Sequence, residues 1–73
     1  LEAIAREFTQ VREAYAVQAG REVRVIVDAG DVDDDRTHGI AREIARRIEE
    51  RLTYPGEIKV TVLREVRAEA SAR

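Results

Sequence analysis

The spacing of the apolar residues changes along the first part of the chain from a helical period to a strand period. In residues 1–9, Leu1, Ile4 and Phe8 recur at steps of three and four, and this spacing predicts a short helix. A helix of this length is not stable alone in water, so we expect it to lean on a sheet. From residue 13 to residue 28 apolar and polar residues alternate, and a period of two is typical of strands.

Two strands joined by a tight turn are predicted within this alternating stretch. They cover residues 14–19 and 22–28, and Gly20-Arg21 lies between them. Glycine at the first position of a two-residue loop suits a type II′ hairpin turn, because glycine tolerates positive φ. The register set by this turn pairs Ala19 with Glu22, Val17 with Arg24, and Tyr15 with Ile26.

The second half of the chain predicts a long helix followed by a third strand. The apolar residues four apart are Ile40, Ile44, Ile48 and Leu52. They predict an amphipathic helix over residues 34–53, which ends at Tyr54-Pro55-Gly56 because proline disfavours helix at the residue before it. Alternation over residues 57–64 predicts the third strand, and we expect residues 66–73 to form a frayed tail.

The resulting order, α-β-β-α-β, indicates a small α+β domain. A three-stranded sheet with both helices on one face is the simplest way to bury these apolar stripes. We expect a split, antiparallel sheet in which the first strand lies between the other two. The alternative places the second and third strands side by side, and the apolar stripes are compatible with both strand orders.

The sheet face turned away from the predicted helices is the candidate interaction face. Its residues are Tyr15, Val17, Arg24, Ile26, Lys59 and Leu63. A sheet with a solvated face alternates more cleanly than this one, and apolar residues gathered on an exposed face indicate a partner. One hypothesis is that a neighbouring domain or a second copy of the chain covers the face. The other is that Tyr15 stacks on an RNA base while Arg21, Arg24 and Lys59 contact phosphates. A bulge in place of the tight turn would exchange the two faces.

Composition narrows the class of protein further. The 73 residues include 13 basic and 15 acidic side chains, and a net charge of −2 provides no general attraction to nucleic acid or anionic lipid. The chain has no cysteine, which excludes the small disulfide-stapled class. Its apolar runs are far shorter than the ~20 residues of a membrane span. We therefore expect residues 1–73 to be one small domain of a larger chain.

The candidates for chemistry within these residues are weak. Asp31, Asp33 and Asp35 have calcium-loop spacing, but Arg36 and Arg42 stand where the loop needs glycine and glutamate. An aspartate-rich helix start is the better interpretation. The only histidine, His38, and the only serine, Ser71, do not form a triad pattern. We expect no catalytic residue, no metal ligand and no cofactor in this piece.

Four stretches resemble the C-terminal domain of the ribonuclease Y family. They are AYAVQAGREVRVIV at residues 14–27, the Asp33-Asp34-Asp35 helix start, the helix with Ile40-Ala41 and Ile44-Ala45, and Tyr54-Pro55-Gly56 followed by IKVTV. The resemblance implies a bacterial endoribonuclease that initiates messenger RNA decay. In such proteins an N-terminal membrane helix and a coiled coil precede a KH domain and a metal-dependent HD domain.

The resemblance also implies where the chemistry of the parent protein lies. Phosphodiester hydrolysis would use a divalent metal in the HD domain, whose histidine and aspartate ligands have no counterpart here. The parent would act at the cytoplasmic side of the membrane, while this piece would not touch the membrane. We expect the piece to be an accessory domain that docks on the upstream HD and KH domains or on a second copy of itself. The alternative is an RNA-binding module that uses the exposed sheet face.

Overall fold

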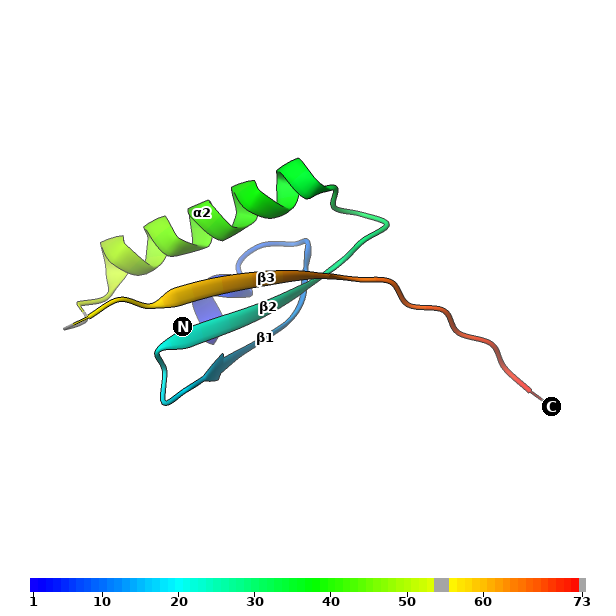
Figure 1. The fold of residues 1–73 in the computed structure, drawn as a ribbon, viewed down its shortest axis with the longest axis horizontal. Helices are drawn as coiled ribbons and strands as arrows, with labels where there is room; N and C mark the ends of the chain where they lie inside the picture. The colour runs from blue at the N-terminus through cyan, green and yellow to red at the C-terminus, as the bar shows by residue number, and fades with distance from the viewer. Residues whose placement is uncertain (54–55, 73) are drawn as a thin grey trace.

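The computed structural model describes residues 1–53 and 56–72. Its elements are α1 (Glu2–Ala5), β1 (Val11–Val17), β2 (Glu22–Asp28), α2 (Asp34–Arg51) and β3 (Lys59–Glu65). Figure 1 shows one three-stranded sheet with α2 alongside it. The predicted α+β class and the α-β-β-α-β order are confirmed. The predicted helix end at Tyr54-Pro55 lies outside the described residues.

The order of the strands differs from the split antiparallel arrangement that we expected. The sheet runs β1-β2-β3, with β1 and β2 antiparallel and β2 and β3 parallel. The predicted order was therefore wrong, because β2 and not β1 is central. The physical reason lies in the core face of β2, where Val23, Val25 and Val27 are all fully buried, whereas β1 contributes only Ala14 to the buried core. The strand with the most apolar surface to bury lies where it has neighbours on both sides.

The connection between β1 and β2 is longer than the predicted two-residue turn. Gln18, Ala19 and Gly20 all have positive φ, at 54°, 57° and 84°, and β1 already ends at Val17, which pairs with Glu22. The register is therefore shifted by two residues from the predicted one, and the tight turn was wrong. Because side chains alternate with a period of two, a shift of two leaves every side chain on its predicted face. A register irregularity between Val11 and Glu13, at the far end of β1, likewise leaves residues 14–17 in place.

The first helix is shorter than the predicted span of residues 1–9. It covers one turn, and the chain then bends so that the backbone N–H of Val11 donates to the Phe8 carbonyl at 3.1 Å. The Arg6 guanidinium donates to the Ala14 carbonyl at 2.9 Å, which joins the bend to β1. The segment after α1 is therefore held in place by contacts with the sheet and not by further helical turns. This is expected for a helix that is too short to be stable alone.

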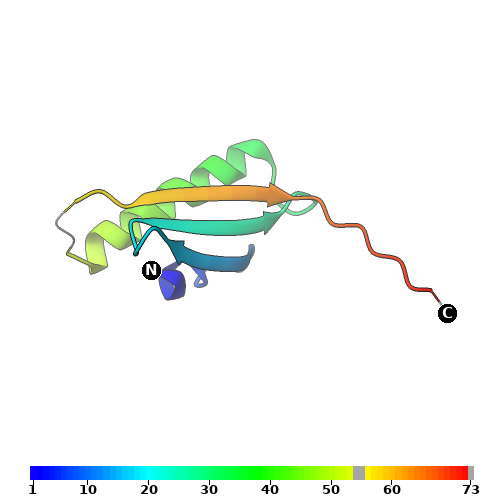
Figure 2. The same ribbon diagram turned by 60° about the horizontal axis from the view of Figure 1, so that its bottom comes forward.

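Both helices lie on the same face of the sheet, as predicted, and enclose a single core. The buried apolar residues are Ile4, Ala5, Ala14, Val23, Val25, Val27, Val32, Ile40, Ile44 and Ile48. The molecule is 16 Å across its shortest axis, enough for one sheet layer and one helix layer. Figure 2, turned by 60° from Figure 1, shows the sheet in front and α2 behind it. Residues 66–72 run away from the sheet without helix or strand, and their fraying stays a prediction.

The aspartate-rich segment starts α2, as the sequence indicated. The Asp33 side chain accepts a hydrogen bond from the backbone N–H of Arg36 at 2.8 Å and so caps the helix. Asp34 and Asp35 lie in the first turn, where negative charge meets the positive end of the helix dipole. From β3, the Arg64 guanidinium donates to the Val32 carbonyl at 2.8 Å and to Asp34 at 2.6 Å. The loop between β2 and α2 is thereby attached to β3.

Replacing the cap will destabilise the domain. We expect Asp33→Ala to lower the free energy of unfolding by about 1 kcal/mol, the usual cost of losing an N-cap. Asp35→Ala is the matched control, because it removes an equal charge nearby without removing a cap, and it should cost clearly less. Urea denaturation followed by circular dichroism measures both variants. Equal losses would show that net charge, and not capping, stabilises this segment.

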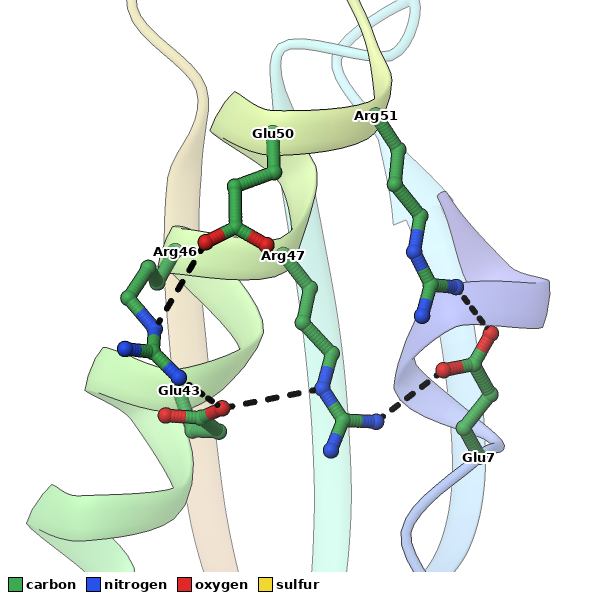
Figure 3. A network of polar contacts seen from close by, with 6 residues as sticks. All are labelled: Glu7, Glu43, Arg46, Arg47, Glu50 and Arg51. Carbon is green, nitrogen blue, oxygen red and sulfur yellow. Dashed lines mark hydrogen bonds and ion pairs between the residues drawn. The ribbon is translucent and has the colours of Figure 1, made fainter.

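A polar network joins the turn after α1 to α2 (Figure 3). The Glu7 carboxylate accepts a hydrogen bond from Arg47 at 3.0 Å and a second one from Arg51. The Arg47 guanidinium also lies over the Phe8 ring, 4.3 Å from its centroid. The hydrogen bond from Arg51, followed by the positive charges of Arg51 and Arg47, lowers the pKa of Glu7 from its ordinary value of 4.5. The ionised form of Glu7 therefore stabilises the folded state.

We expect Glu7→Gln to reduce the urea midpoint at neutral pH. A carboxyl whose pKa is depressed by folding contributes stability above its unfolded pKa of about 4.5 and loses it as the pH falls through the folded value. The urea midpoints of the parent and the variant should therefore converge on acidification. Glu49→Gln is the control, since Glu49 makes no ion pair among the described residues. If the urea midpoints of the parent and of Glu7→Gln still differ in acid, the stabilisation does not come from the ionised form of Glu7.

Candidate functional site

One face of the sheet is not covered by either helix, and we call it the open face. Its residues are Glu13, Tyr15 and Val17 from β1, Glu22, Arg24, Ile26 and Asp28 from β2, and Lys59, Thr61, Leu63 and Glu65 from β3. The register arranges them in rows that cross the strands. All six residues of the predicted interaction face belong to this set. Whether the face binds a partner stays a prediction.

The rows bring some of the predicted residues into direct contact and leave others diagonal. Val17, Glu22 and Lys59 form the row nearest the β1–β2 loop. The next row is Tyr15, Arg24 and Thr61, and the third is Glu13, Ile26 and Leu63. Tyr15 is therefore opposite Arg24, and Ile26 lies beside Leu63. The predicted pairs of Tyr15 with Ile26 and Val17 with Arg24 are diagonal neighbours, because the register is shifted.

The apolar residues of the middle two rows are Tyr15, Ile26 and Leu63, which we call the apolar centre. The same rows also hold Glu13, Arg24 and Thr61. The side chains of Tyr15 and Leu63 are 39% and 46% exposed, and Ile26 is partly buried between its neighbours. The buried valines of β2 lie on the opposite side of the same sheet. Large apolar side chains that are gathered on an exposed face are typical of a contact surface.

A buried carboxylate organises the row nearest the loop, and the sequence reasoning missed it. Glu22 is only 3% exposed. Its carboxylate accepts hydrogen bonds from the Thr61 hydroxyl at 2.9 Å, from the Gln18 amide at 3.1 Å and from Arg24 Nε at 3.2 Å. The bond from Thr61, and then the one from Arg24, lowers the pKa of Glu22, so the group is held as a carboxylate. No pattern in the sequence marks Glu22, because its burial depends on side chains from three separate segments.

Charge on the open face differs between its two ends. At the end nearest the loop, Arg24 pairs with Glu22, Lys59 is the register partner of Glu22 on β3, and Arg21 precedes Glu22 in the loop. At the other end are three acidic residues, Glu13, Asp28 and Glu65. Arg12 pairs with Asp28 at 2.8 Å and Arg67 pairs with Glu65 at 2.7 Å. The loop end is thus net basic, and the other end is net acidic.

The aspartates with calcium-loop spacing lie at and just before the start of α2. Across residues 1–53 and 56–72, no three histidine, cysteine, aspartate or glutamate side chains are placed together as metal ligands. Asp33 and Asp34 are occupied at the helix start and with Arg64. Within the same ranges, none of the helices is both long enough and apolar enough to span a bilayer.

Fold and surface together define a small α+β domain with one exposed sheet face. No family model matches the chain, and no solved structure matches it. It is 60% identical over all 73 residues to ribonuclease Y of Lawsonia intracellularis, covering 14% of that protein. It is 56% identical over 73 residues to ribonuclease Y of Roseiflexus sp. strain RS-1, covering 14%, and 52% identical to that of Lactobacillus helveticus, covering 13%.

The chain belongs to the ribonuclease Y family. This confirms the resemblance seen in the hairpin run, the aspartate-rich helix start and the final strand. The relatives are bacterial proteins, and each is matched along the whole of this chain. The chain spans about 14% of the length of the curated relatives that it matches.

Proposed function

We propose that this domain is an accessory domain of a bacterial endoribonuclease that initiates messenger RNA decay. The observation that carries the proposal is its identity of 52–60% with ribonuclease Y proteins over the full 73 residues. The role within the enzyme is contact, because the open face presents an apolar centre and the described residues present no nucleophile and base in partnership. Catalysis then belongs to another part of the same protein.

The remainder of this proposal rests on the family resemblance. The reaction is hydrolysis of an RNA phosphodiester with a divalent metal held by an HD domain, and a KH domain contributes RNA binding. An N-terminal membrane helix keeps the enzyme at the cytoplasmic side of the membrane. Within that enzyme, the open face docks on the HD and KH domains or on a second copy of this domain.

Docking through the open face is supported by the position of its apolar residues. Ile26 and Leu63 are neighbours in the parallel pair β2–β3, and Tyr15 lies one row away on β1. Burying them against another surface would remove from water the largest apolar side chains that this face exposes. A charge placed at Ile26 would enter the middle of that contact, where it would have to be desolvated.

Thiol labelling tests whether the open face is covered in the whole enzyme. The chain has no cysteine, so Leu63→Cys introduces a single thiol. We expect this thiol to react with a maleimide several-fold more slowly in the full-length ribonuclease than in a dilute solution of the isolated chain. Adding Ile26→Asp to the full-length protein should restore fast labelling. Peptide mass spectrometry measures both rates.

Val66→Cys is the matched control for this experiment. Val66 follows β3 directly, lies off the sheet and is 86% exposed, so its replacement should label at similar rates in both proteins. Equal labelling at position 63 in the isolated chain and in the full-length enzyme would overturn the docking role. Slow labelling at position 63 in a folded full-length protein that also carries Ile26→Asp would overturn the docking role as well.

A second candidate function is direct RNA binding by the open face. The observation in its favour is the net basic loop end, where Lys59 lies in the row next to that of the partly exposed Tyr15 and Arg21 lies in the loop. Against it, Glu22 holds Arg24 in an ion pair at 3.2 Å. If the face binds RNA, Lys59→Ala should weaken binding of single-stranded RNA and reduce the salt dependence of binding by about one phosphate contact. A fluorescence anisotropy titration at low salt that shows no binding by the parent chain excludes this function.

A further inference from the structure

The two outer strands of the sheet differ in how well they are protected against the addition of a further strand. These strands are β1 and β3, because β2 is central. A register irregularity between Val11 and Glu13 interrupts β1, and the Arg6 guanidinium occupies one of its carbonyls. By contrast, β3 pairs with β2 over all seven of its residues without a register shift, and it contains no proline. A long and regular edge of this kind is one to which another strand can add.

The backbone groups of β3 alternate between β2 and the outer edge of the sheet. The N–H of Lys59, its first residue, and the carbonyl of Glu65, its last, each make a hydrogen bond of 2.9 Å to residues that flank β2. Residues 59, 61, 63 and 65 therefore bond toward β2, since successive residues of a strand direct their backbone groups to opposite sides. The N–H and C=O groups of residues 60, 62 and 64 are directed to the outer edge. The described part of the chain places no strand there.

We infer that an extended segment of a partner protein adds to this sheet as a fourth strand beside β3. Its main chain bonds to the outward N–H and C=O groups of residues 60, 62 and 64, in the mode known as β-augmentation. The tail of the chain itself does not occupy this position, because residues 66–72 run away from the sheet (Figure 2). The site lies at the edge of the sheet and is separate from the open face, so it goes beyond the contact role proposed above.

The position of α2 determines the side chains that the fourth strand carries on the helix side of the sheet. Of the three strands, β3 is the one that α2 approaches most closely, and Figure 2 shows the N-terminal part of α2 reaching beyond the outer edge of β3. Ala45 of α2 lines a groove together with Ile58, just before β3, so this side of α2 faces the edge. Ala41 lies one turn earlier on the same side, and both alanines are partly exposed. The fourth strand therefore lies beneath α2 and presents apolar side chains to it.

On the open side of the sheet, the neighbours of the fourth strand are Lys59, Thr61 and Leu63. Lys59 is exposed and makes no ion pair within 4 Å among the described residues. The carboxylate of its register partner, Glu22, already accepts hydrogen bonds from other side chains. An acidic side chain of the partner beside Lys59 therefore adds a favourable pair of opposite charge. The segment that fits this edge alternates apolar and polar residues, and one of its polar residues is aspartate or glutamate.

Fluorescence anisotropy with synthetic peptides tests this inference on the 73-residue chain. The first probe is a fluorescein-labelled decapeptide in which valine alternates with threonine and one central threonine is replaced by glutamate. The second probe has lysine in place of the glutamate. We expect the parent chain to bind the glutamate probe about fivefold more tightly than the lysine probe, the effect of one exposed ion pair. N-methylation of the four central amides of the glutamate probe should abolish binding, because it removes donors from both edges of the peptide.

Three variants locate the peptide on the protein. Lys59→Glu should reverse the preference, so that the lysine probe binds about fivefold more tightly than the glutamate probe. Arg42→Glu makes the same change of charge on the exposed side of α2 and should keep the parental preference. Tyr15→Ser alters the open face on β1, two strands from the outer edge of β3, and should bind both probes as the parent does.

The outcomes separate the fourth strand from the proposed docking role. The fourth strand is overturned if the parent chain does not bind the glutamate probe, if the N-methylated probe binds equally well, or if folded Lys59→Glu protein keeps the parental preference. Weaker binding by Tyr15→Ser would also overturn it, because the peptide would then lie on the open face. The docking role is tested separately, by the rate of thiol labelling at position 63 in the full-length ribonuclease, and either idea can fail while the other holds.

Discussion

The packing of the α2 isoleucines on the valines of β2 is the contact on which the rest of the domain depends. A chain of this size buries only about 60% of the surface that it exposes when unfolded, so its core is thin. Here the core occupies one side of the sheet, between Ile40, Ile44 and Ile48 and the three valines of β2. Both helices lie on that side, so the described residues include no second layer for the other side of the sheet. An open face is the consequence of a two-layer domain.

Polar contacts hold the thin core in position from its periphery. Arg64 attaches the start of α2 to β3, and Glu7 attaches the turn after α1 to the last turns of α2. On the open face, the carboxylate of Glu22 joins the loop, β2 and β3 in the same way. Each of these side chains makes a hydrogen bond to a segment at least 30 residues away in sequence. Exposed ion pairs contribute little singly, but such links select one arrangement of the segments over others.

Elements with a strong local pattern were predicted almost completely. The bounds of β2 agree with the prediction, and α2 begins where its aspartates indicated and ends two residues early. Isoleucine spacing and an N-cap are properties of adjacent residues, so they can be recognised without the fold. The six residues of the candidate face were also assigned to one side of the sheet, because a register shift of two preserves the alternation. The burial of Glu22 was missed, since its partners Gln18, Arg24 and Thr61 come from three segments.

The sequence by itself determined the elements, their apolar faces and the family to which the chain belongs. Tertiary structure alone decided the strand order, the conformation of the β1–β2 loop and the length of α1. The physical reason is that both strand orders bury the same stripes, so local pattern does not distinguish them. The strand order depends on which strand buries the most apolar surface when it has a neighbour on each side. This is a property of the free energy of the whole assembled sheet. The loop and α1 likewise depend on distant segments, since Arg6 donates to the Ala14 carbonyl and the Gln18 amide shares the Glu22 carboxylate with Thr61 of β3.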